Sequence, residues 1–532
     1  MRAPKTLVLL ARVEPAAATP RVDLSGGTAT NIINRLFTAG LAYNDDRQVP
    51  YPYLAEALPQ LNTDTWRVFP DGRMETTYVL RPGLTWHDGT PLSAEDFVFA
   101  LRVYTDPEVG SMFEANPQRA MEDVAAPDAR TVVIRWQLPY VDAGQLSGGK
   151  NGFPPMPRHI LEQAMRTDAS AVPGHPFWTR EHIGLGPYRL ERWEPGAFID
   201  GVAFDGHALG RPRIDRVKMI WNADPNTALA NLLSGNADLA ADASLAFQQG
   251  VILKREWAPR QGGNVILNSD EVRYVQIQAR PEYANPRAIM DVRVRKALAY
   301  AIDRQALLDG MLDGEGVIAD TIVSPDTEYY PELDRILTKY PYDPRRTEQV
   351  MAEVGITRGA DGLYAGATGD RFSPEVRGPL ENELSILVDG WRRAGVSAQP
   401  SVTPAALATN NEYRASFPAF ALTKSSLPDR TAVRKYATSD VAAPENRYGG
   451  TNKGGYSHPE FDRLNAAFQR ALDRNERNKL VIDMMTFASE QLPSFPLYYD
   501  LTVVAHVAAL QGPRRSSPDA LEFWNIHQWE WR

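Results

Sequence analysis

The alternation of apolar and polar residues is clearest just past the middle of the chain. Residues 272–280 (VRYVQIQAR) alternate in this way and are rich in β-branched side chains, which predicts a strand. Two prolines follow, and apolar residues then recur at helical spacing from Val294 to Leu308. Asp291 is placed to cap the start of this helix, and the glycines from Gly310 onward are expected to end it. The pattern therefore predicts a strand that leads into one buried helix.

Similar patterns predict elements elsewhere in the chain. A first strand is expected at 5–13, and a further strand at 131–136. Asp343 is followed by a proline, which is typical of an N-cap and the first residue of a helix. Ser457 opens the sequence SHPE, which predicts a capping box with Ser457 as the N-cap. The Gly-rich run 448–456 is expected to be mobile.

Length and composition limit the possible classes of protein. A chain of 532 residues is too long for one ordinary core, so two or more domains are expected. The 43% hydrophobic and 23% charged residues are typical of a soluble globular protein, and no apolar run approaches the ~20 residues of a membrane span. The formal net charge of −9 without a basic cluster disfavours nucleic-acid binding. The absence of cysteine excludes disulfides, thiolate metal sites and a lipid-anchored cysteine, and we expect no cofactor.

Two groups of residues invite a catalytic or metal-binding interpretation. His87 and Asp88 could form an acid–base pair, but they lie in a turn, which favours a structural role. His175, Glu181 and His182 could be metal ligands, but their spacing matches no helical ligand pair. We therefore predict no catalytic residues and no metal site.

Sequence motifs spread over most of the chain resemble those of one protein family and occur in that family's order. They are YVLRPGLTWHDGTPL (78–92), GLGPYRL (184–190), DVRVRKALAYAIDRQALLDGMLDGEGVIA (291–319), GYSHPEFD (455–462) and LPSFPLYY (492–499). Together they resemble the family 5 extracellular solute-binding proteins, the peptide, nickel and oligosaccharide receptors of ABC importers. The dipeptide- and oligopeptide-binding proteins are members of this family. Each motif alone is weakly specific, but the set covers nearly the whole chain.

The resemblance implies an α/β fold of the two-lobed periplasmic-binding-protein type. This is the type II arrangement of the large cluster, with an extra subdomain in lobe I and a hinge of two crossing segments. The boundaries that it implies are 1–42, 184–271 and 498–532 for the lobe I core, 43–183 for the extra subdomain, and 272–497 for lobe II.

The resemblance also implies a function. It predicts an extracytoplasmic receptor that captures a small ligand in the cleft between the lobes by hinge closure and delivers it to an ABC permease. The ligand would be a peptide or peptide-like molecule, an opine or a sugar. The protein is expected to be a monomer with no enzymatic activity, and to associate with the membrane only through the permease. The alternatives are a periplasmic hydrolase on the same fold, and a ligand-dependent sensor or protein-binding module.

The expected location is periplasmic or extracellular. The apolar run from Leu7 to Ala11 is shorter than the ~7–15 residues of a signal-peptide core, and Arg12 interrupts it. A first strand is the better interpretation of this run, so we expect that a signal peptide has been removed.

Ligand-binding residues can be nominated by their position along the chain. Gln276, Gln278, Tyr498 and Tyr499 lie on the expected crossing strands and should be near the ligand, although the tyrosines could instead pack the hinge. In relatives, the loop after the first strand contributes to the site, which nominates Glu14.

A second nomination comes from the segment 420–429, in which Phe420, Thr423, Lys424 and Ser425 are the candidates. Peptide-binding relatives carry an aspartate here that pairs with the α-amine of the peptide, whereas this chain has serine near that position and adds Lys424. A cation in place of an amine anchor favours a neutral or acidic ligand. Two alternatives remain open: Asp429 could serve as the anchor, and Lys424 could simply be solvated.

Overall fold

In the computed structural model the chain divides into two compact units, Met1–Asn268 with Thr502–Arg532, and Ser269–Leu501. The residues that the structure describes are 6–19, 29–110, 116–147, 152–426, 429–515 and 523–532. The predicted lobe boundaries, after residues 271 and 497, lie three and four residues from the divisions after 268 and 501. The separate subdomain expected at 43–183 stays a prediction. The charged N-terminal residues before Thr6 lie outside the described residues.

The main sheet of the first unit is built on β1 (Thr6–Ala11), a strand in which Leu7, Leu9, Leu10 and Ala11 are fully buried. The strand order is β11 (Leu239–Ala240), β1, β10 (Arg216–Trp221), β9 (Phe198–Ala203) and β8 (Tyr188–Glu194). β1 runs parallel to β10 and β11, β9 is antiparallel to β10, and β8 is antiparallel to β9. The strand predicted at 5–13 is thus present in a shorter form.

A second sheet of the first unit has the order β4 (Trp66–Val68), β5 (Met74–Val79), β7 (Thr131–Trp136) and β6 (Met121–Ala125). β7 has the bounds that the alternation predicts. The described part of this unit also contains the α-helices and strands α1 (Ala29–Phe37), α2 (Glu95–Thr105), α3 (Arg158–Thr167), α4 (Pro225–Ser234), α5 (Phe247–Trp257), β2 (Ala42–Asn44), β3 (Pro50–Pro52), β19 (Leu510–Gln511) and β20 (Glu530–Trp531).

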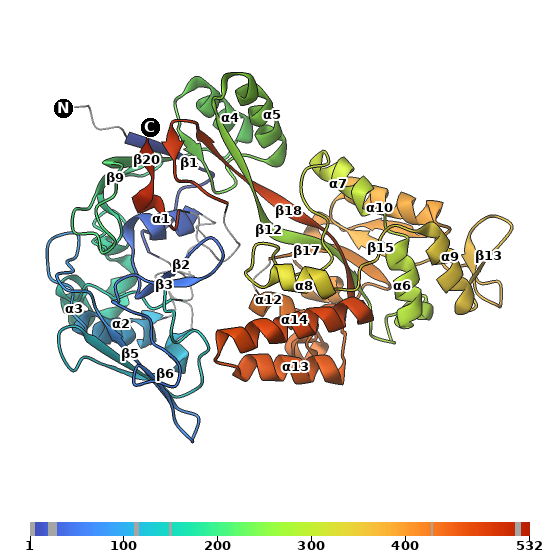
Figure 1. Cartoon of the computed structure of the whole chain (residues 1–532), viewed down its shortest axis with the longest axis horizontal. Helices are drawn as coiled ribbons and strands as arrows, with labels where there is room; N and C mark the ends of the chain where they lie inside the picture. The colour runs from blue at the N-terminus through green and yellow to red at the C-terminus, as the bar shows by residue number, and fades with distance from the viewer. Residues whose placement is uncertain (1–5, 20–28, 111–115, 148–151, 427–428, 516–522) are drawn as a thin grey trace. The chain divides into compact units, whose positions relative to one another are not determined.

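The sheet of the second unit has the order β16 (Gln399–Val402), β15 (Glu375–Gly378), β17 (Phe420–Ser426), β12 (Gly263–Ile277) and β18 (Ser494–Val507). β12 and β18 are neighbours, and Figure 1 shows these two long strands side by side in green and red. The strand predicted from residue 272 is the end of β12. The other strands of this unit are β13 (Thr357–Arg358) and β14 (Tyr364–Ala365).

The prediction of a single helix after residue 291 is wrong: the structure has two helices there. α6 (Val292–Tyr300) ends before α7 (Arg304–Leu312) begins. The carboxylate of Asp303 accepts a hydrogen bond from the Ala306 N–H at 3.0 Å, so this residue starts a new helix inside the apolar pattern. Gly310 lies within α7, which ends at Leu312.

Two of the three predicted helix caps are confirmed. Asp291 accepts from the Arg293 N–H at 2.8 Å, and Asp343 accepts from the two N–H groups that open α9 (Pro344–Glu353). The capping box at Ser457 is wrong. Pro459 takes the first position of α13 (Pro459–Arg470), so the N-cap is the residue before it, His458.

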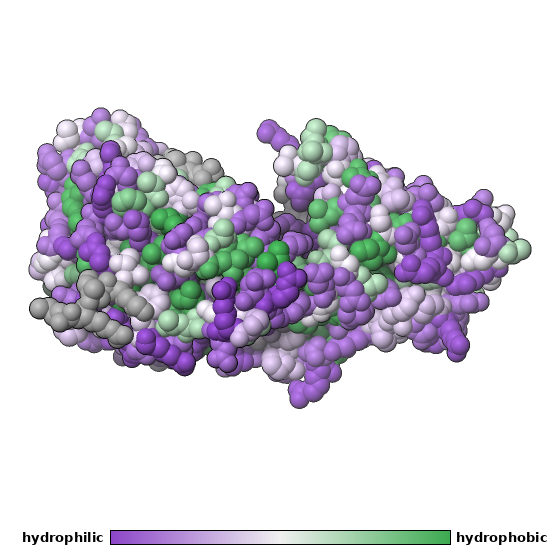
Figure 2. Space-filling model, turned by 90° about the horizontal axis from the view of Figure 1, so that it is seen from above, coloured by the Kyte–Doolittle hydropathy of each residue, from purple (hydrophilic) through white to green (hydrophobic). Residues whose placement is uncertain are grey.

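Helices cover both faces of the second unit's sheet, and Figure 1 shows α13 and α14 (Arg474–Gln491) as an adjacent pair. Their apolar residues Phe461 and Met485 share a buried core with Val272 and Tyr274 of β12 and with Tyr499 of β18. The other helices of this unit are α8 (Tyr330–Ile336), α10 (Glu381–Arg393), α11 (Asn411–Ala415) and α12 (Asp429–Arg434). On the face seen in Figure 2, polar side chains cover most of the surface and apolar ones form small groups between them.

Candidate functional site

A cavity of about 290 Å³ lies within the second unit, on the β12–β17 pair. Its floor contains two directly paired positions of these antiparallel strands, Tyr274 with Thr423 and Gln276 with Ala421. Other lining residues come from β15, from β17, from the segments around α11 and α12, and from the run before α13. They are Arg377, Pro379, Thr403, Ala408, Asn411, Tyr413, Arg414, Phe417, Leu422, Lys424, Lys435, Gly449, Gly450, Thr451 and Lys453.

The two faces of β12 have different roles, because successive side chains of a strand point to opposite sides. Tyr274 and Gln276 line the cavity. Arg273, which precedes Tyr274 and so points to the opposite face, donates to both carboxylate oxygens of Glu383 on α10, and the Tyr498 hydroxyl donates to the same carboxylate at 2.6 Å. This buried ion pair ties β12, α10 and β18 together behind the cavity floor.

The Gly-rich run beside the cavity, expected to be mobile, is anchored at Asn452. Its side-chain amide donates to the carbonyls of Ala437 (3.0 Å) and Tyr456 (2.7 Å), and its oxygen accepts from the Tyr456 N–H (3.1 Å). The side-chain amide of Gln276 also contacts this run. In the orientation in which both its oxygen and its nitrogen find partners, the Gln276 oxygen accepts hydrogen bonds from the N–H groups of Lys453 and Gly454. The run is therefore fixed to the floor of the cavity.

Arg280 connects two walls of the cavity. Its guanidinium donates to the carbonyl of Lys453 at 2.7 Å, to that of Ala442 at 2.7 Å, and to that of Ala415. Gln278 supports the same wall, because its amide donates to the carbonyls of Ala415 (3.1 Å) and Phe417 (2.7 Å). These two residues position lining segments from beneath.

The charge of the cavity is strongly positive. Five of its lining residues are arginine or lysine, and none of its described lining residues is aspartate or glutamate. Two of the cations have carboxylate partners beside the cavity. Lys424 Nζ lies 2.5 Å from Glu271, and Arg377 Nε lies 2.8 Å from Glu375.

The other three cations, Arg414, Lys435 and Lys453, have no carboxylate partner among the described residues. Lys453 is buried, and its ammonium donates to the Asn411 amide oxygen at 3.0 Å and to the Tyr448 carbonyl. Burial, followed by repulsion from neighbouring cations that include Arg414, lowers the pKa of Lys435 to about 8 and that of Lys453 to about 8.

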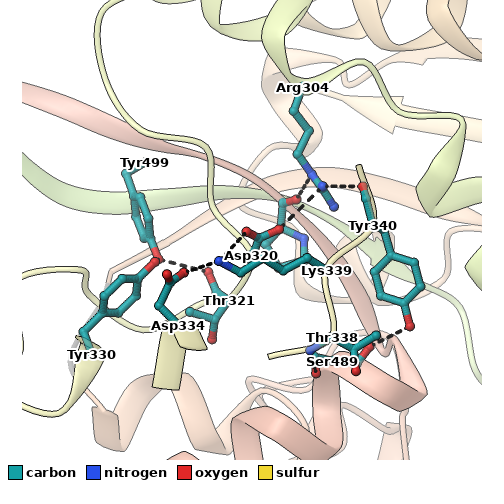
Figure 3. A network of polar contacts seen from close by, with 11 residues as sticks. Arg304, Asp320, Thr321, Tyr330, Asp334, Thr338, Lys339, Tyr340, Ser489 and Tyr499 are labelled. Atoms are coloured by element: carbon teal, nitrogen blue, oxygen red, sulfur yellow. Dashed lines mark hydrogen bonds and ion pairs between the residues drawn. The ribbon is translucent and has the colours of Figure 1, made fainter. Parts of the chain in front are cut away.

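A second polar cluster of this unit surrounds Asp320, and Figure 3 shows its side chains pointing toward one another. Arg304 and Lys339 lie 3.7 Å and 3.9 Å from the Asp320 carboxylate, and Lys339 also pairs with Asp334. Burial raises the pKa of Asp320, and the two cations oppose that shift. The cavity here measures about 20 Å³, the space of one water molecule, so we interpret the cluster as structural.

The structure places the nominated residues at different sites. Gln276, Thr423 and Lys424 line the cavity. Ser425 is buried in β17, and Phe420 packs in the core against Trp391 and Phe495. Their contact with a ligand stays a prediction.

The remaining nominated residues make internal contacts. The Tyr499 hydroxyl donates to the Val323 carbonyl at 2.9 Å, and Figure 3 shows it meeting the Tyr330 hydroxyl. In the first unit, Glu14 accepts from the Trp193 indole at 2.8 Å and from the Gly196 N–H at 2.9 Å. The side chain of Asp429, the alternative anchor, lies outside what the structure describes.

Sequence reasoning missed four cations of the cavity, which are Arg377, Arg414, Lys435 and Lys453. They come from separate elements, and no local pattern links them. The Gly-rich run that contains Lys453 was the one available signal, and it was interpreted as a mobile segment.

The histidines that could be catalytic have structural contacts. His87 is buried, its Nε2 lies 3.0 Å from the Gly186 carbonyl, and its Nδ1 accepts from the Gly184 N–H at 3.1 Å. Burial lowers its pKa to about 3, so the ring is neutral. Asp88 contacts His159 instead, at 2.8 Å. Over the described ranges, no group of three or more His, Cys, Asp or Glu side chains could hold a metal ion.

Comparison with known proteins identifies the class and then the family. The solved structure of HbpA2 from Haemophilus parasuis aligns with a TM-score of 0.78 over 99% of this chain and 100% of that one, at 18% identity. NikZ from Campylobacter jejuni in complex with Ni(L-His) aligns with a TM-score of 0.67 over 99% of both chains, at 21% identity. The fold is therefore that of the two-domain periplasmic binding proteins, as predicted.

The family follows from the sequence. The model of the bacterial extracellular solute-binding proteins, family 5 (middle) matches residues 56–431, so the chain belongs to this family. The oligopeptide-binding protein AppA of Bacillus subtilis is 24% identical over 520 residues, 94% of this chain and 87% of that protein. The family predicted from the motifs is thereby confirmed, and its members are binding proteins of ABC importers. Among the described helices, none has the length and apolar character needed to cross a membrane.

Proposed function

We propose that this protein is the receptor subunit of an ABC importer and that it binds its ligand in the cationic cavity of the second unit. The observation that carries the proposal is the combination of a fixed strand floor, aromatic walls and five cations in one cavity of a solute-binding protein. Binding sites for small molecules have this composition, in which apolar walls surround a few placed polar groups.

The chemistry of the cavity supports binding rather than catalysis. Its polar groups are guanidinium, ammonium, amide and hydroxyl groups, which hold a ligand by donating hydrogen bonds. We therefore propose that the protein has no enzymatic activity.

The partners and location follow from the family. We propose a periplasmic or extracellular protein that delivers its ligand to the transmembrane subunits of an ABC permease and is otherwise a monomer. Of the relatives named above, AppA is named as an oligopeptide-binding protein, and NikZ was solved in complex with Ni(L-His). For this chain we propose a small ligand of peptide, peptide-like, opine or sugar type. Its capture between the lobes stays a prediction.

A thermal-shift screen tests the proposal. Ligand-free protein, refolded from denaturant, is screened with peptides, opines, sugars and metal chelates. At least one compound should raise the Tm by several degrees, because a ligand that binds only the folded state stabilises it. The same compound should give a much smaller shift with Arg414→Ala. Lys479→Gln, an exposed position on α14, is the control and should keep the full shift. If no compound in the panel raises the Tm, the receptor function is contradicted.

A further inference from the structure

The charge balance of the cavity points to the chemical class of the ligand. Lys424 and Arg377 are each neutralised by a neighbouring carboxylate, Glu271 and Glu375. Arg414, Lys435 and Lys453 have no such partner in the described part of the chain. Three adjacent cations without a counter-charge repel one another, so the ligand-free cavity carries an unfavourable electrostatic energy.

The three groups also have unused hydrogen-bonding capacity. Neither the Arg414 guanidinium nor the Lys435 ammonium is hydrogen-bonded to another described group, whereas Lys453 already donates to Asn411 and Tyr448. Burial, followed by repulsion from neighbouring cations, lowers the pKa of Lys435 and of Lys453, and no carboxylate of the described residues is among the groups that act on either pKa. An anion that enters the cavity would satisfy these donors and remove the repulsion.

The lining of the cavity favours an anion that is part of an organic molecule. Tyr274, Tyr413 and Phe417 provide aromatic surface, and the volume of about 290 Å³ is much larger than an inorganic ion requires. An amine-bearing end of a peptide is disfavoured, because none of the described lining residues is a carboxylate that could pair with it.

We propose that the ligand is an organic anion whose carboxylate or phosphate group is held by Arg414, Lys435 and Lys453. Such charge-assisted hydrogen bonds are shorter and stronger than neutral ones, and the planar Arg414 guanidinium can donate two to one oxyanion group. This inference rests on the proposed function, because it names the class of ligand for the same cavity.

The test uses pairs of probes, each with one charged and one uncharged member. They are glutarate with glutaramide, glycerol 3-phosphate with glycerol, and the terminally blocked tripeptide acetyl-Glu-Ala-Glu-amide with acetyl-Gln-Ala-Gln-amide. Binding to ligand-free protein is measured by calorimetry at pH 7. In at least one pair the charged probe should bind about tenfold tighter or more, and the pair in which this occurs separates a carboxylate source from a phosphate source.

Variants connect the effect to the named residues. Lys435→Gln should reduce the affinity for the charged probe by about tenfold, whereas Lys435→Arg, which keeps the charge, should retain most of it. Lys479→Gln should have no effect.

The proposal is overturned if the uncharged probes bind as tightly as the charged ones, or if Lys435→Gln leaves charged-probe binding unchanged. It is also overturned if no charged probe binds while an uncharged compound of the screening panel does. In these cases the receptor function stands. If neither the probes nor the panel bind, both the inference and the receptor function fail.

Discussion

At the scale of single residues, Lys435 and Lys453 contribute much of the positive charge of the proposed site. The whole chain has a formal net charge of −9, yet these two amines and Arg414 make the cavity positive. Salt screens charges beyond about 8 Å at physiological ionic strength, so the groups within the cavity dominate what a bound ligand experiences.

Binding of an anionic ligand should weaken as the pH rises from 7 to 9. With a pKa of about 8 each, Lys435 and Lys453 are mostly protonated at pH 7 and mostly neutral at pH 9. The neighbouring guanidinium groups, Arg434 beside Lys435 and Arg280 beside Lys453, are themselves cations and do not offset the change. Calorimetric titration with the tightest charged probe at three pH values measures the effect. A doubly substituted protein, Lys435→Arg with Lys453→Arg, should show a flatter profile, and equal affinity of the unchanged protein at pH 7 and 9 would argue against the account.

His87 should make the first unit sensitive to acid. Its pKa of about 3 in the folded protein is below the ~6.5 of an unfolded chain, so the unfolded state binds more protons between these values. The contribution of the neutral ring is fully present above pH 6.5 and is lost as the pH falls toward 3. We expect His87→Asn to lower the Tm at pH 7.5 but to show a smaller further drop between pH 7.5 and 5 than the unchanged protein. Parallel drops in the two proteins, measured by differential scanning calorimetry, would show that His87 is not a titrating group.

At the scale of elements, strands and helix starts were predictable where a local physical rule decides them. The bounds of β7 and the caps at Asp291 and Asp343 follow from alternation and from carboxylates that accept N–H groups. The break between α6 and α7 was missed because apolar residues continue across it, and only the hydrogen bond from Ala306 to Asp303 marks it.

The candidate site was less predictable than the fold. Gln276, Thr423 and Lys424 were found because they lie on two strands that the family pattern marks. Arg414 and Lys453 were not found. They are brought close together because Arg280 donates to the carbonyls of both Ala415 and Lys453, and no sequence spacing predicts that contact.

Arg280 should therefore control both the cavity and the stability of the second unit. Arg280→Lys keeps the charge but loses the planar fork that reaches three carbonyls, so we expect about tenfold weaker probe binding and a lower Tm. The exposed Arg287→Lys is the matched control and should behave like the unchanged protein. Unaltered affinity in Arg280→Lys would show that the walls hold their positions without this contact.

The Arg273–Glu383 pair should be essential for the packing of β12 on α10. Glu383→Gln leaves the buried Arg273 charge without its partner, which costs about 3–5 kcal/mol of unfolding free energy. Tyr498→Phe removes one hydrogen bond to Glu383 and should cost about 1 kcal/mol. The exposed Glu381→Gln, at the start of the same helix, should cost under about 0.5 kcal/mol. Chemical denaturation of the three variants checks this order, and an equal loss in Glu383→Gln and Glu381→Gln would contradict it.

At the scale of the whole molecule, the chain belongs to a family of solute-binding proteins, and its sheet strands β12 and β18 continue from one compact unit into the other. The family and the two-domain fold were predictable, because motifs along nearly the whole chain occur in the family's order. The ligand was not, because it depends on side chains that the fold gathers from distant segments of the second unit. The central claim is thus that this protein captures a small molecule there.

Native mass spectrometry of the protein as purified tests that claim most directly. The account predicts an additional small mass that is lost after denaturation and refolding, is absent or strongly reduced in Lys435→Gln, and is retained in Lys479→Gln. The released molecule should carry a net negative charge at pH 7. A protein that shows the bare chain mass before and after refolding, and that binds nothing in the ligand panel, would contradict the account.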